Sequence, residues 1–244
     1  MIQFINFSAS FGDRKVVQDL TCNLPSNSIT ALIGVSGSGK TTILRVLCRM
    51  NDRMENFHVE GRVLIDGVDI HEADADVYSL RRKVGMIFQK PCVFPKSIFE
   101  NVVFGIREVT KIPKKDYPDL AEKVLREVFL WEEVKDRLHE KATTLSQGQQ
   151  QRLTLARTLA VGPDVLLMDE PTSSLDPKSS AAIEKLVQTL KCRHTILWVT
   201  HQHDQAQSIS DRVLVLEEGQ ASGPSVSMKK MKEQASITNI LQSN

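Results

Sequence analysis

Two short segments, far apart in the chain, carry groups suited to binding and splitting a phosphate chain. The first is Gly34-Val35-Ser36-Gly37-Ser38-Gly39-Lys40-Thr41, followed by Thr42. Its glycines would let backbone N–H groups wrap the β-phosphate of a nucleotide, and the N-terminus of the next helix adds partial positive charge. Lys40 would reach the β- and γ-phosphates, and the Thr41 hydroxyl would bind Mg²⁺. The apolar run Ile29–Ile33 before the loop and helical spacing after it give the strand–loop–helix context of a true phosphate loop.

The second segment is the carboxylate pair Asp169-Glu170, directly after the apolar run Val165–Met168. Open α/β sheets place ligand-binding groups at the carboxyl ends of buried strands. There Asp169 would hold Mg²⁺ through water, and Glu170 would polarise the attacking water as general base. The alternative is a surface turn, because Pro171 follows. Together with the phosphate loop, the pair favours nucleotide hydrolysis.

Other polar residues at element ends have ordinary structural alternatives. Ser146 and Gly148 begin a predicted helix that continues through Leu159, and Ser146 is a good N-cap whatever else it does. His201 ends the predicted strand Thr195–Thr200; it is either a ligand contact, a satisfied core or surface histidine, or half of a metal pair with His203. No Cys or carboxylate cluster completes such a pair in the sequence.

Composition narrows the functional classes. The 244 residues carry 31 basic and 30 acidic side chains, so no overall field draws the chain to nucleic acid or anionic lipid. The four cysteines form no C-x-x-C pair, which favours reduced thiols over a disulfide frame or zinc site. No secretion signal and no apolar stretch of about 18 residues is visible. If the protein works at a membrane, other chains are expected to hold it there.

Apolar periodicity predicts an α/β nucleotide-binding core made of residues 1–89 and 151–244, interrupted by a helical subdomain at 90–150. Strands are expected at Phe4–Phe7, Val16–Leu24 and Arg62–Ile65, with a tight turn at Asp66-Gly67. Val84–Phe88, Val165–Met168 and Ile196–Val199 are continuous apolar runs, typical of buried parallel strands. Within Asp116–Arg137, one helix face would carry Leu120, Val124, Val128 and Phe129. The tail from Gly219 is rich in Ser, Lys and Met, with one helix predicted after Ser225.

These motifs, in this order and over nearly the whole chain, resemble the nucleotide-binding subunits of ABC transporters. The resemblance implies a P-loop NTPase (ABC ATPase) core with an antiparallel β subdomain and an inserted helical subdomain. It implies that Ser146, Gln147, Gly148 and Gln149 form the signature that contacts ATP held by the opposite subunit. It makes Gln89 the Q-loop residue that senses Mg²⁺ and the γ-phosphate, and His201 the switch histidine. Asp176 would lie in the D-loop at the dimer interface, and Phe11 would stack on adenine, unless it is an ordinary packed aromatic.

A closer resemblance is to the ATP-binding subunits of bacterial phosphate importers. It is carried by Arg49–Asp52, Glu60–Gly67, Leu80–Pro91, Phe94–Ile98 and Glu100–Val102. It implies a Mg²⁺-dependent ATPase that drives uptake of inorganic phosphate, or, as the alternative, of another oxyanion or small solute. The implied partners are a second copy of the chain, integral-membrane permease subunits and, through them, a solute-binding protein, with no nucleic acid. The implied location is peripheral, on the cytoplasmic face of the inner membrane.

Three features depart from that family. Cys92-Val93 replaces its usual Asn-Pro, Gln147 stands where the signature usually has glycine, and the C-terminal tail differs. None of these changes a predicted catalytic group. Other nucleotide-binding classes fit less well. Lys40 and Ser146 are too close for an intervening long coiled coil, the chain has one cassette rather than two, and no Asn-Lys-x-Asp guanine-reading motif occurs. A pure interaction module would not need Lys40, Asp169 and Glu170 in these contexts.

Overall fold

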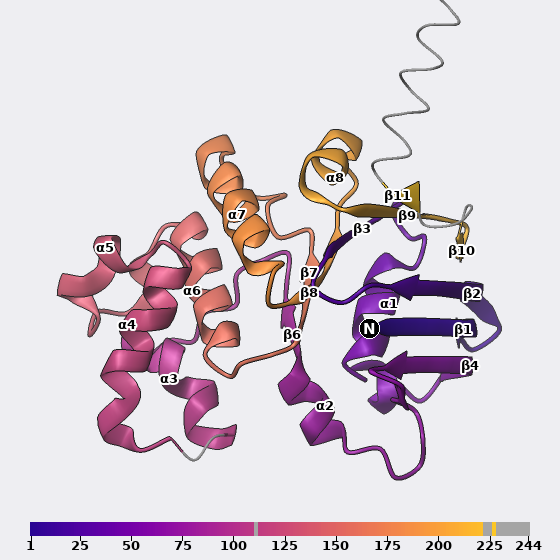
Figure 1. The fold of residues 1–244 in the computed structure, drawn as a ribbon, viewed down its shortest axis with the longest axis horizontal. Coiled ribbons are helices and arrows are strands. Elements are labelled where there is room, and N and C mark those ends of the chain that lie inside the picture. Colours follow the sequence, from indigo (N-terminus) through magenta and orange to yellow (C-terminus); the bar gives the residue numbers. More distant parts are fainter. Residues whose placement is uncertain (110–111, 222–225, 228–244) are drawn as a thin grey trace, which may run out of the picture. The chain divides into compact units, whose positions relative to one another are not determined.

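A computed structural model describes residues 1–109, 112–221 and 226–227 of the chain. Contacts between residues divide it into two units: Met1–Val77 together with the chain from Thr195 onward, and Tyr78–His194. Most helices and strands of the two units are labelled in Figure 1.

The first unit contains an antiparallel sheet with the strand order β2-β1-β4-β5. Its strands are β1 (Ile2–Phe11), β2 (Arg14–Leu24), β4 (Phe57–Ile65) and β5 (Val68–Asp69). The β4–β5 turn has φ of 52° at Asp66 and 83° at Gly67, as expected for the tight turn predicted there. This sheet confirms the predicted antiparallel β subdomain.

A second group of strands in the same unit is built on β3 (Ile29–Ile33), which pairs in parallel with β8 (Thr195–Val199) and β9 (Arg212–Glu217). Every residue of β3 and β8 is buried, which explains their continuous apolar sequences. Two short strands, β10 (Gln220–Ala221) and β11 (Val226–Ser227), pair antiparallel with β9. The helix predicted after Ser225 lies outside the described residues, apart from the pair that forms β11.

The described part of the first unit contains the helices α1 and α8, labelled in Figure 1, and the short 3₁₀ helix η1. Their bounds are Lys40–Leu47 for α1, His203–Ile209 for α8 and Asn51–Arg53 for η1. Helix α1 begins directly after the phosphate loop, and α8 begins just after the end of β8. The ends of β3 and β8 therefore each lead to a helix, whereas the end of β1, which carries Phe11, leads to β2.

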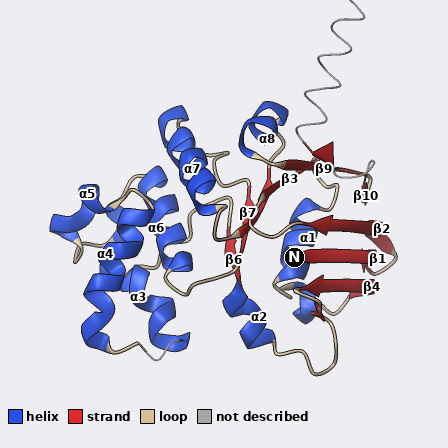
Figure 2. Ribbon diagram, in the orientation of Figure 1, coloured by secondary structure: helices blue, strands red, loops and turns tan. Residues whose placement is uncertain are grey.

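The second unit contains two parallel strands, β6 (Val84–Ile87) and β7 (Val165–Asp169), paired from Val84↔Val165 to Ile87↔Met168. Its remaining elements are helices (Figure 2). They are α2 (Val77–Lys83), α3 (Ile98–Val109), α4 (Tyr117–Glu127), α5 (Trp131–Val134), α6 (Gln147–Leu159) and α7 (Pro177–Leu190), with 3₁₀ turns η2 (Lys114–Asp116), η3 (Lys135–Arg137) and η4 (Ala142–Thr144). The signature helix α6 packs against α3, α4 and β6. Helix α6 therefore contacts both the helices α3 and α4 and the strand β6, which ends just before the predicted Q-loop residue Gln89.

One sequence-based placement is wrong. Val124 and Val128 are buried as predicted, but Phe129 is 47% exposed. The helix α4 ends at Glu127, and Phe129 adopts a left-handed conformation with φ of 54° before α5 begins. This turn rotates the Phe129 side chain away from the face that an uninterrupted helix would have buried.

The contact-based units do not share the boundaries predicted for the helical subdomain. Residues 90–150 contain α3, α4, α5 and the first turn of α6, so that segment is helical as expected. Its separation from the core as a subdomain stays a prediction. Among the residues that the structure describes, no helix is long and apolar enough to span a bilayer.

Candidate nucleotide site

The phosphate loop is shaped by close contact with two backbone carbonyls of its own unit. A Cβ added at Gly34 would lie 2.2 Å from the carbonyl oxygen of Leu216, at the end of β9. At Gly39, where φ is +101°, a Cβ would lie 2.5 Å from the carbonyl oxygen of Val16 in β2. Neither approach is possible for a residue with a side chain, so both positions require glycine.

Polar groups inside the loop fit a bound phosphate. The Lys40 side chain donates from Nζ to the carbonyl oxygens of Gly34 at 2.7 Å and Val35 at 2.8 Å. Ser38 Oγ is buried and makes no hydrogen bond within the described part of the chain. Helix α1 begins at Lys40, and its N-cap residue Gly39 provides no side chain to cap it. A buried hydroxyl and a helix N-terminus both gain a hydrogen-bond partner from a phosphate oxygen.

A pocket of about 310 Å³ opens beside the loop. Its walls are Val35–Ser38 of the loop, Arg14–Val16 of β2 and the turn Glu218-Gly219 between β9 and β10. Sequence reasoning missed the last two segments, because nothing local to them signals a ligand. They reach the loop through strand pairing that joins distant parts of the chain.

Two further predicted residues belong to the first unit. The Phe11 ring lies 4.9 Å from the Phe57 ring, centroid to centroid, at 49°, and is half-buried. His201 is exposed on the turn after β8. That turn is held by Thr200, whose Oγ1 donates to Gln205 Oε1 at 2.8 Å and accepts from the Gln202 N–H at 3.1 Å. Adenine stacking by Phe11 and γ-phosphate contact by His201 stay predictions.

In the second unit, the structure brings the predicted general base next to the Q-loop glutamine. Gln89 Nε2 donates to Glu170 Oε2 at 3.4 Å and to Ser173 Oγ at 3.1 Å. Ser173 donates both its N–H and its hydroxyl to the Glu170 carbonyl, at 3.2 and 3.1 Å. Glu170 has φ of 45°, which is rare for a residue with a side chain and is typical of functional positions. Asp169 lies beside it as the last residue of β7.

The Q-loop is also held by the signature helix. Gln151, a polar residue 1% exposed on the inner face of α6, donates from Nε2 to the Phe88 carbonyl at 3.1 Å. Arg157 of the same helix donates to the Cys92 carbonyl at 2.7 Å. Sequence reasoning did not select either residue. Both lie on a helix that is rich in Gln, Arg and Thr, so nothing in the local sequence separates them from its other polar residues.

The signature itself forms the start of α6. Ser146 is the N-cap: its Oγ accepts from the Gln149 N–H at 3.3 Å, and Gln149 Oε1 accepts from the Ser146 N–H at 2.9 Å. A Cβ at Gly148 would lie 2.5 Å from Ser179 Oγ in α7. Ser179 in turn donates its N–H to Asp176 Oδ1 at 3.0 Å. The signature and the predicted D-loop segment are therefore neighbours within this unit, and Gln147 is exposed.

The predicted site residues thus fall into two groups. Phe11, the loop Gly34–Thr42 and His201 belong to one unit; Gln89, Ser146–Gln149, Asp169-Glu170 and Asp176 belong to the other. Each group is locally ordered, and the assignment of both groups to one nucleotide site stays a prediction.

Comparison with known proteins identifies the family. Residues 17–173 match the ABC transporter family. The chain belongs to that family. A "Phosphate import ATP-binding protein PstB" of Shewanella denitrificans is 45% identical over 219 residues, covering 90% of this chain and 80% of the relative. The protein of the same name from Colwellia psychrerythraea is 48% identical over 202 residues, covering 83% of this chain and 72% of the relative.

A solved structure supports the fold. It is cbiO1 from Clostridium perfringens, described as part of the ABC transporter complex cbiONQ. It superposes with a TM-score of 0.83 at 24% identity, covering 100% of this chain and 94% of that one. The predicted family, ABC ATPase fold class and ATPase class of this ABC transporter subunit are confirmed.

Proposed function

We propose that this ABC ATPase drives the uptake of inorganic phosphate. The observation that carries the proposal is its 45–48% identity, over most of the chain, to proteins named for phosphate import and ATP binding. The subunit itself holds nucleotide rather than solute, so the solute is inferred from this likeness. An importer of another oxyanion or small solute is the alternative.

ATP is expected to bind through the phosphate loop, with Mg²⁺ beside its phosphates. Thr41, Asp169 and Gln89 offer a hydroxyl, a carboxylate and an amide oxygen, which are the hard oxygen donors that Mg²⁺ prefers. Across the described residues no group of three or more His, Cys, Asp and Glu is placed to hold a metal alone. Mg²⁺ commonly relies on one or two protein ligands plus substrate phosphates, so this donor set fits. When bound, Mg²⁺ would neutralise charge on the β- and γ-phosphates.

Within that site Glu170 acts as general base toward the attacking water. Its contact with the Gln89 amide supports this role, because the amide positions the carboxylate beside the predicted Q-loop residue. His201 contacts the γ-phosphate from its turn after β8. Lys40 moves from the loop carbonyls to the β- and γ-phosphates.

Two copies close head to tail, with Ser146–Gln149 of one chain against the ATP held by Gly34–Thr41 of the other. The capped start of α6 supports this arrangement, since Ser146 and Gln147 are both exposed there. Asp176 lies next to the signature and would share the interface. ATP closes the dimer, and hydrolysis reopens it.

The dimer is tested with Glu170→Gln, which keeps the side chain's shape but cannot accept a proton. Sizing chromatography should show an ATP-dependent dimer that ADP does not support. Adding Ser146→Arg should abolish it by placing bulk and charge in the opposite site, and Lys40→Ala should abolish ATP binding itself. A monomer at saturating ATP, or an equally strong dimer with ADP, would refute the sandwich.

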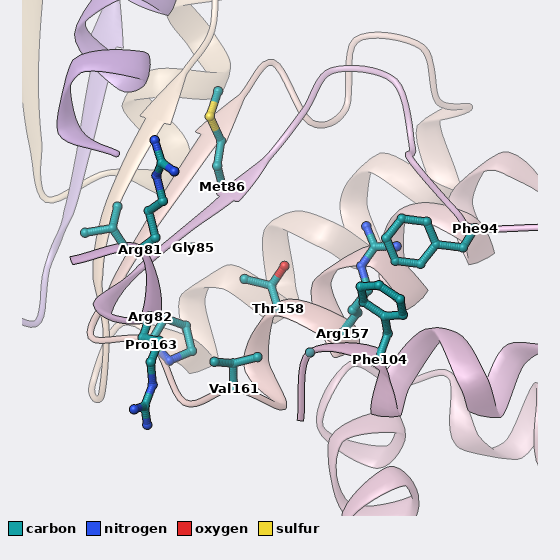
Figure 3. A pocket seen from close by; sticks show the side chains of 12 residues that line it. Arg81, Arg82, Gly85, Met86, Phe94, Phe104, Arg157, Thr158, Val161 and Pro163 are labelled. Carbon is teal, nitrogen blue, oxygen red and sulfur yellow. The ribbon is translucent and has the colours of Figure 1, made fainter. Parts of the chain in front are cut away.

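Permease subunits are expected to dock near the segment after Gln89. A pocket of about 250 Å³ lies there, between α2, β6, α3 and α6 (Figure 3). Arg81 and Arg82 line one side, and the Phe94 and Phe104 rings, 4.6 Å apart, line the other. Arg157 lies over the Phe94 ring at 4.3 Å. This mixture of basic and aromatic side chains suits an apolar permease segment that carries an acidic residue, and it would hold the subunit peripherally at the cytoplasmic face of the inner membrane.

Co-purification tests the docking. Arg82→Glu should reduce the amount of permease that co-purifies, whereas Lys185→Glu, on the exposed face of α7, should not. Equal recovery with both variants would place the permease elsewhere.

Transport is tested in cells that depend on this subunit. Replacing it with the Lys40→Ala variant should abolish high-affinity phosphate uptake, even when the solute-binding protein that delivers phosphate to the importer is present. Normal phosphate uptake with loss of another solute's uptake would establish the alternative importer.

A further inference from the structure

The signature motif is connected by hydrogen bonds to a carboxylate on another helix. The side chain of Gln149 bonds in two directions. Its Oε1 accepts from the Ser146 N–H at 2.9 Å, and its Nε2 donates to Glu133 Oε2, on α5, at 2.8 Å. Glu133, Gln149 and Ser146 therefore form a continuous relay that ends at the N-cap of the signature helix.

Glu133 is itself fixed from the other side. Arg152 donates from Nη1 to Glu133 Oε1 at 2.6 Å and from Nη2 to Oε2 at 3.2 Å. The same Nη1 donates to the Phe129 carbonyl at 2.6 Å, in the left-handed turn that precedes α5. The Arg152 side chain is only 12% exposed. A bidentate guanidinium with a third, backbone contact leaves the carboxylate little freedom.

The chemistry of a carboxylate then orients the glutamine. An ionised carboxylate only accepts hydrogen bonds, so it must face the NH₂ end of the Gln149 amide. The amide oxygen, Oε1, then faces Ser146 and accepts a hydrogen bond from its N–H. The Ser146 N–H favours the same orientation because it needs an acceptor, and the Glu133 carboxylate adds a second, charge-assisted contact that holds it.

Glu133 stays ionised under ordinary conditions. Partial burial raises the pKa of its carboxyl, but hydrogen bonds from Arg152 and Gln149 and the charges of Arg152 and Arg137 outweigh burial. The net result is a pKa below the ordinary glutamate value.

We propose that Glu133 is a positioning residue for the signature motif, which sets the Ser146 N-cap through the Gln149 side chain. This rests on the proposed function, in which Ser146 meets ATP bound by a second copy. Glu133 contacts neither the nucleotide nor the attacking water in that scheme. It acts on dimer closure, while ATP binding to the phosphate loop of the same chain does not depend on it.

The first experiment compares two adjacent glutamates of α5 in the Glu170→Gln background. Glu133→Ala should weaken the ATP-dependent dimer about tenfold or more, from the loss of charge-assisted hydrogen bonds. ATP affinity of the monomer should be unchanged. Glu132→Ala is the matched control, because Glu132 bonds Arg126 and Lys135 instead of Gln149. An unchanged dimer with Glu133→Ala, or an equal loss with Glu132→Ala, would overturn the proposal.

Exchanging the side-chain types of Glu133 and Gln149 tests whether the hydrogen bond between them positions Ser146, or whether either substitution merely disrupts the local structure. Gln149→Glu alone sets two carboxylates against each other and should weaken the dimer. Combined with Glu133→Gln, the new amide at position 133 can donate to the new carboxylate at 149, whose other oxygen still accepts from the Ser146 N–H. A tighter dimer for the double variant than for Gln149→Glu alone supports the relay; equal dimers refute it.

A third measurement does not depend on ATP. Amide hydrogen exchange over residues 145–152 should accelerate in Glu133→Ala and stay unchanged in Glu132→Ala. If the Glu170→Gln parent forms no dimer with ATP while exchange follows this pattern, the sandwich fails and the relay stands. If exchange is unaffected, the relay fails whatever the dimer does.

Discussion

The phosphate loop and the signature motif, which the proposed function places on the same nucleotide, are held in shape by different means. The loop is fixed by backbone approaching backbone: Gly34 and Gly39 lie against the carbonyls of Leu216 and Val16, with no room for a side chain. The signature is fixed by side chains: its N-cap is closed by Gln149, which Glu133 holds. The loop is constrained by backbone contacts at two glycines, and the start of the signature helix by a few side-chain hydrogen bonds.

This difference explains where each motif tolerates change. At the signature, Gln147 occupies an exposed position and its side chain has room, so the departure from glycine leaves the helix start intact. Gly148, one residue later, faces Ser179 and has no such room. In the loop, the two glycines beside carbonyls cannot change, while Gly37 has open space around it and only its φ of +81° favours glycine.

The largest expected effect is therefore in the loop, with Gly39→Ala. The added methyl would meet the Val16 carbonyl at 2.5 Å in a backbone conformation unfavourable for alanine, so the loop must move. We expect a loss of about 3 kcal/mol, or roughly 100-fold in ATP affinity, measured by titration calorimetry. Gly37→Ala is the control, with strain of about 1 kcal/mol and a loss of roughly fivefold. Equal losses for the two variants would mean that φ, rather than the carbonyl contact, decides.

The next effect concerns packing at the signature. In Gly148→Ala the new Cβ would lie 2.5 Å from Ser179 Oγ and 2.7 Å from its Cβ, so α6 and α7 must separate locally. Overpacking of this kind costs about 1–3 kcal/mol, which predicts a dimer weaker by roughly 5- to 150-fold in the Glu170→Gln background. Adding Ser179→Gly removes both clashing atoms and should restore much of the dimer. If backbone contacts determined the signature, changing the Ser179 side chain would not restore the dimer. Failure of Ser179→Gly to restore it would therefore mean that the signature, like the phosphate loop, is fixed by its backbone.

The difference between local and tertiary constraints also decides which parts of the site the sequence predicts. The phosphate loop is predicted from local sequence, because its glycines, Lys40 and Thr41 lie close together between an apolar strand and a helix with apolar residues at helical spacing. Asp169-Glu170 is read for the same reason, since the strand that ends there is a continuous apolar run. The parallel strands and the antiparallel β subdomain follow from local pattern and turn residues.

What lies outside local pattern was not predictable. The break at Phe129 depends on a left-handed residue with no glycine or asparagine to announce it. The role of Gln151 depends on where the end of β6 lies, and the role of Glu133 depends on how α5 packs beside α6. These are tertiary contacts between segments whose spacing in sequence has no fixed period, so neither helix nor strand periodicity indicates them.

A smaller effect is expected from pH. Because the folded pKa of Glu133 is lowered, its contribution to stability is present above the unfolded pKa of about 4.3 and is lost as pH falls through the folded value. The carboxylate is partly exposed, so we expect less than about 1 kcal/mol. The difference in thermal midpoint between the parent and Glu133→Gln should be constant from about pH 8 to pH 5 and should shrink below about pH 4. A difference that changes between pH 6 and 8 would assign the effect to another group.

The smallest effect is predicted for Gln147→Gly, which restores the glycine usual in this family's signature. Gln147 is the first residue of α6, and glycine is a poorer helix former than glutamine. The free energy of unfolding should therefore fall by about 0.5 kcal/mol, with a slightly lower melting temperature. Exposed substitutions away from packed contacts usually change free energies by about 0.5 kcal/mol or less, so dimer affinity should stay within about threefold. Sedimentation of the Glu170→Gln parent with and without the change measures this. A gain of about tenfold or more, equivalent to about 1.4 kcal/mol, would show that the Gln147 side chain obstructs the partner's nucleotide. The signature would then require bare backbone at this position, as the phosphate loop does at Gly34 and Gly39, and the distinction between the two motifs would not hold.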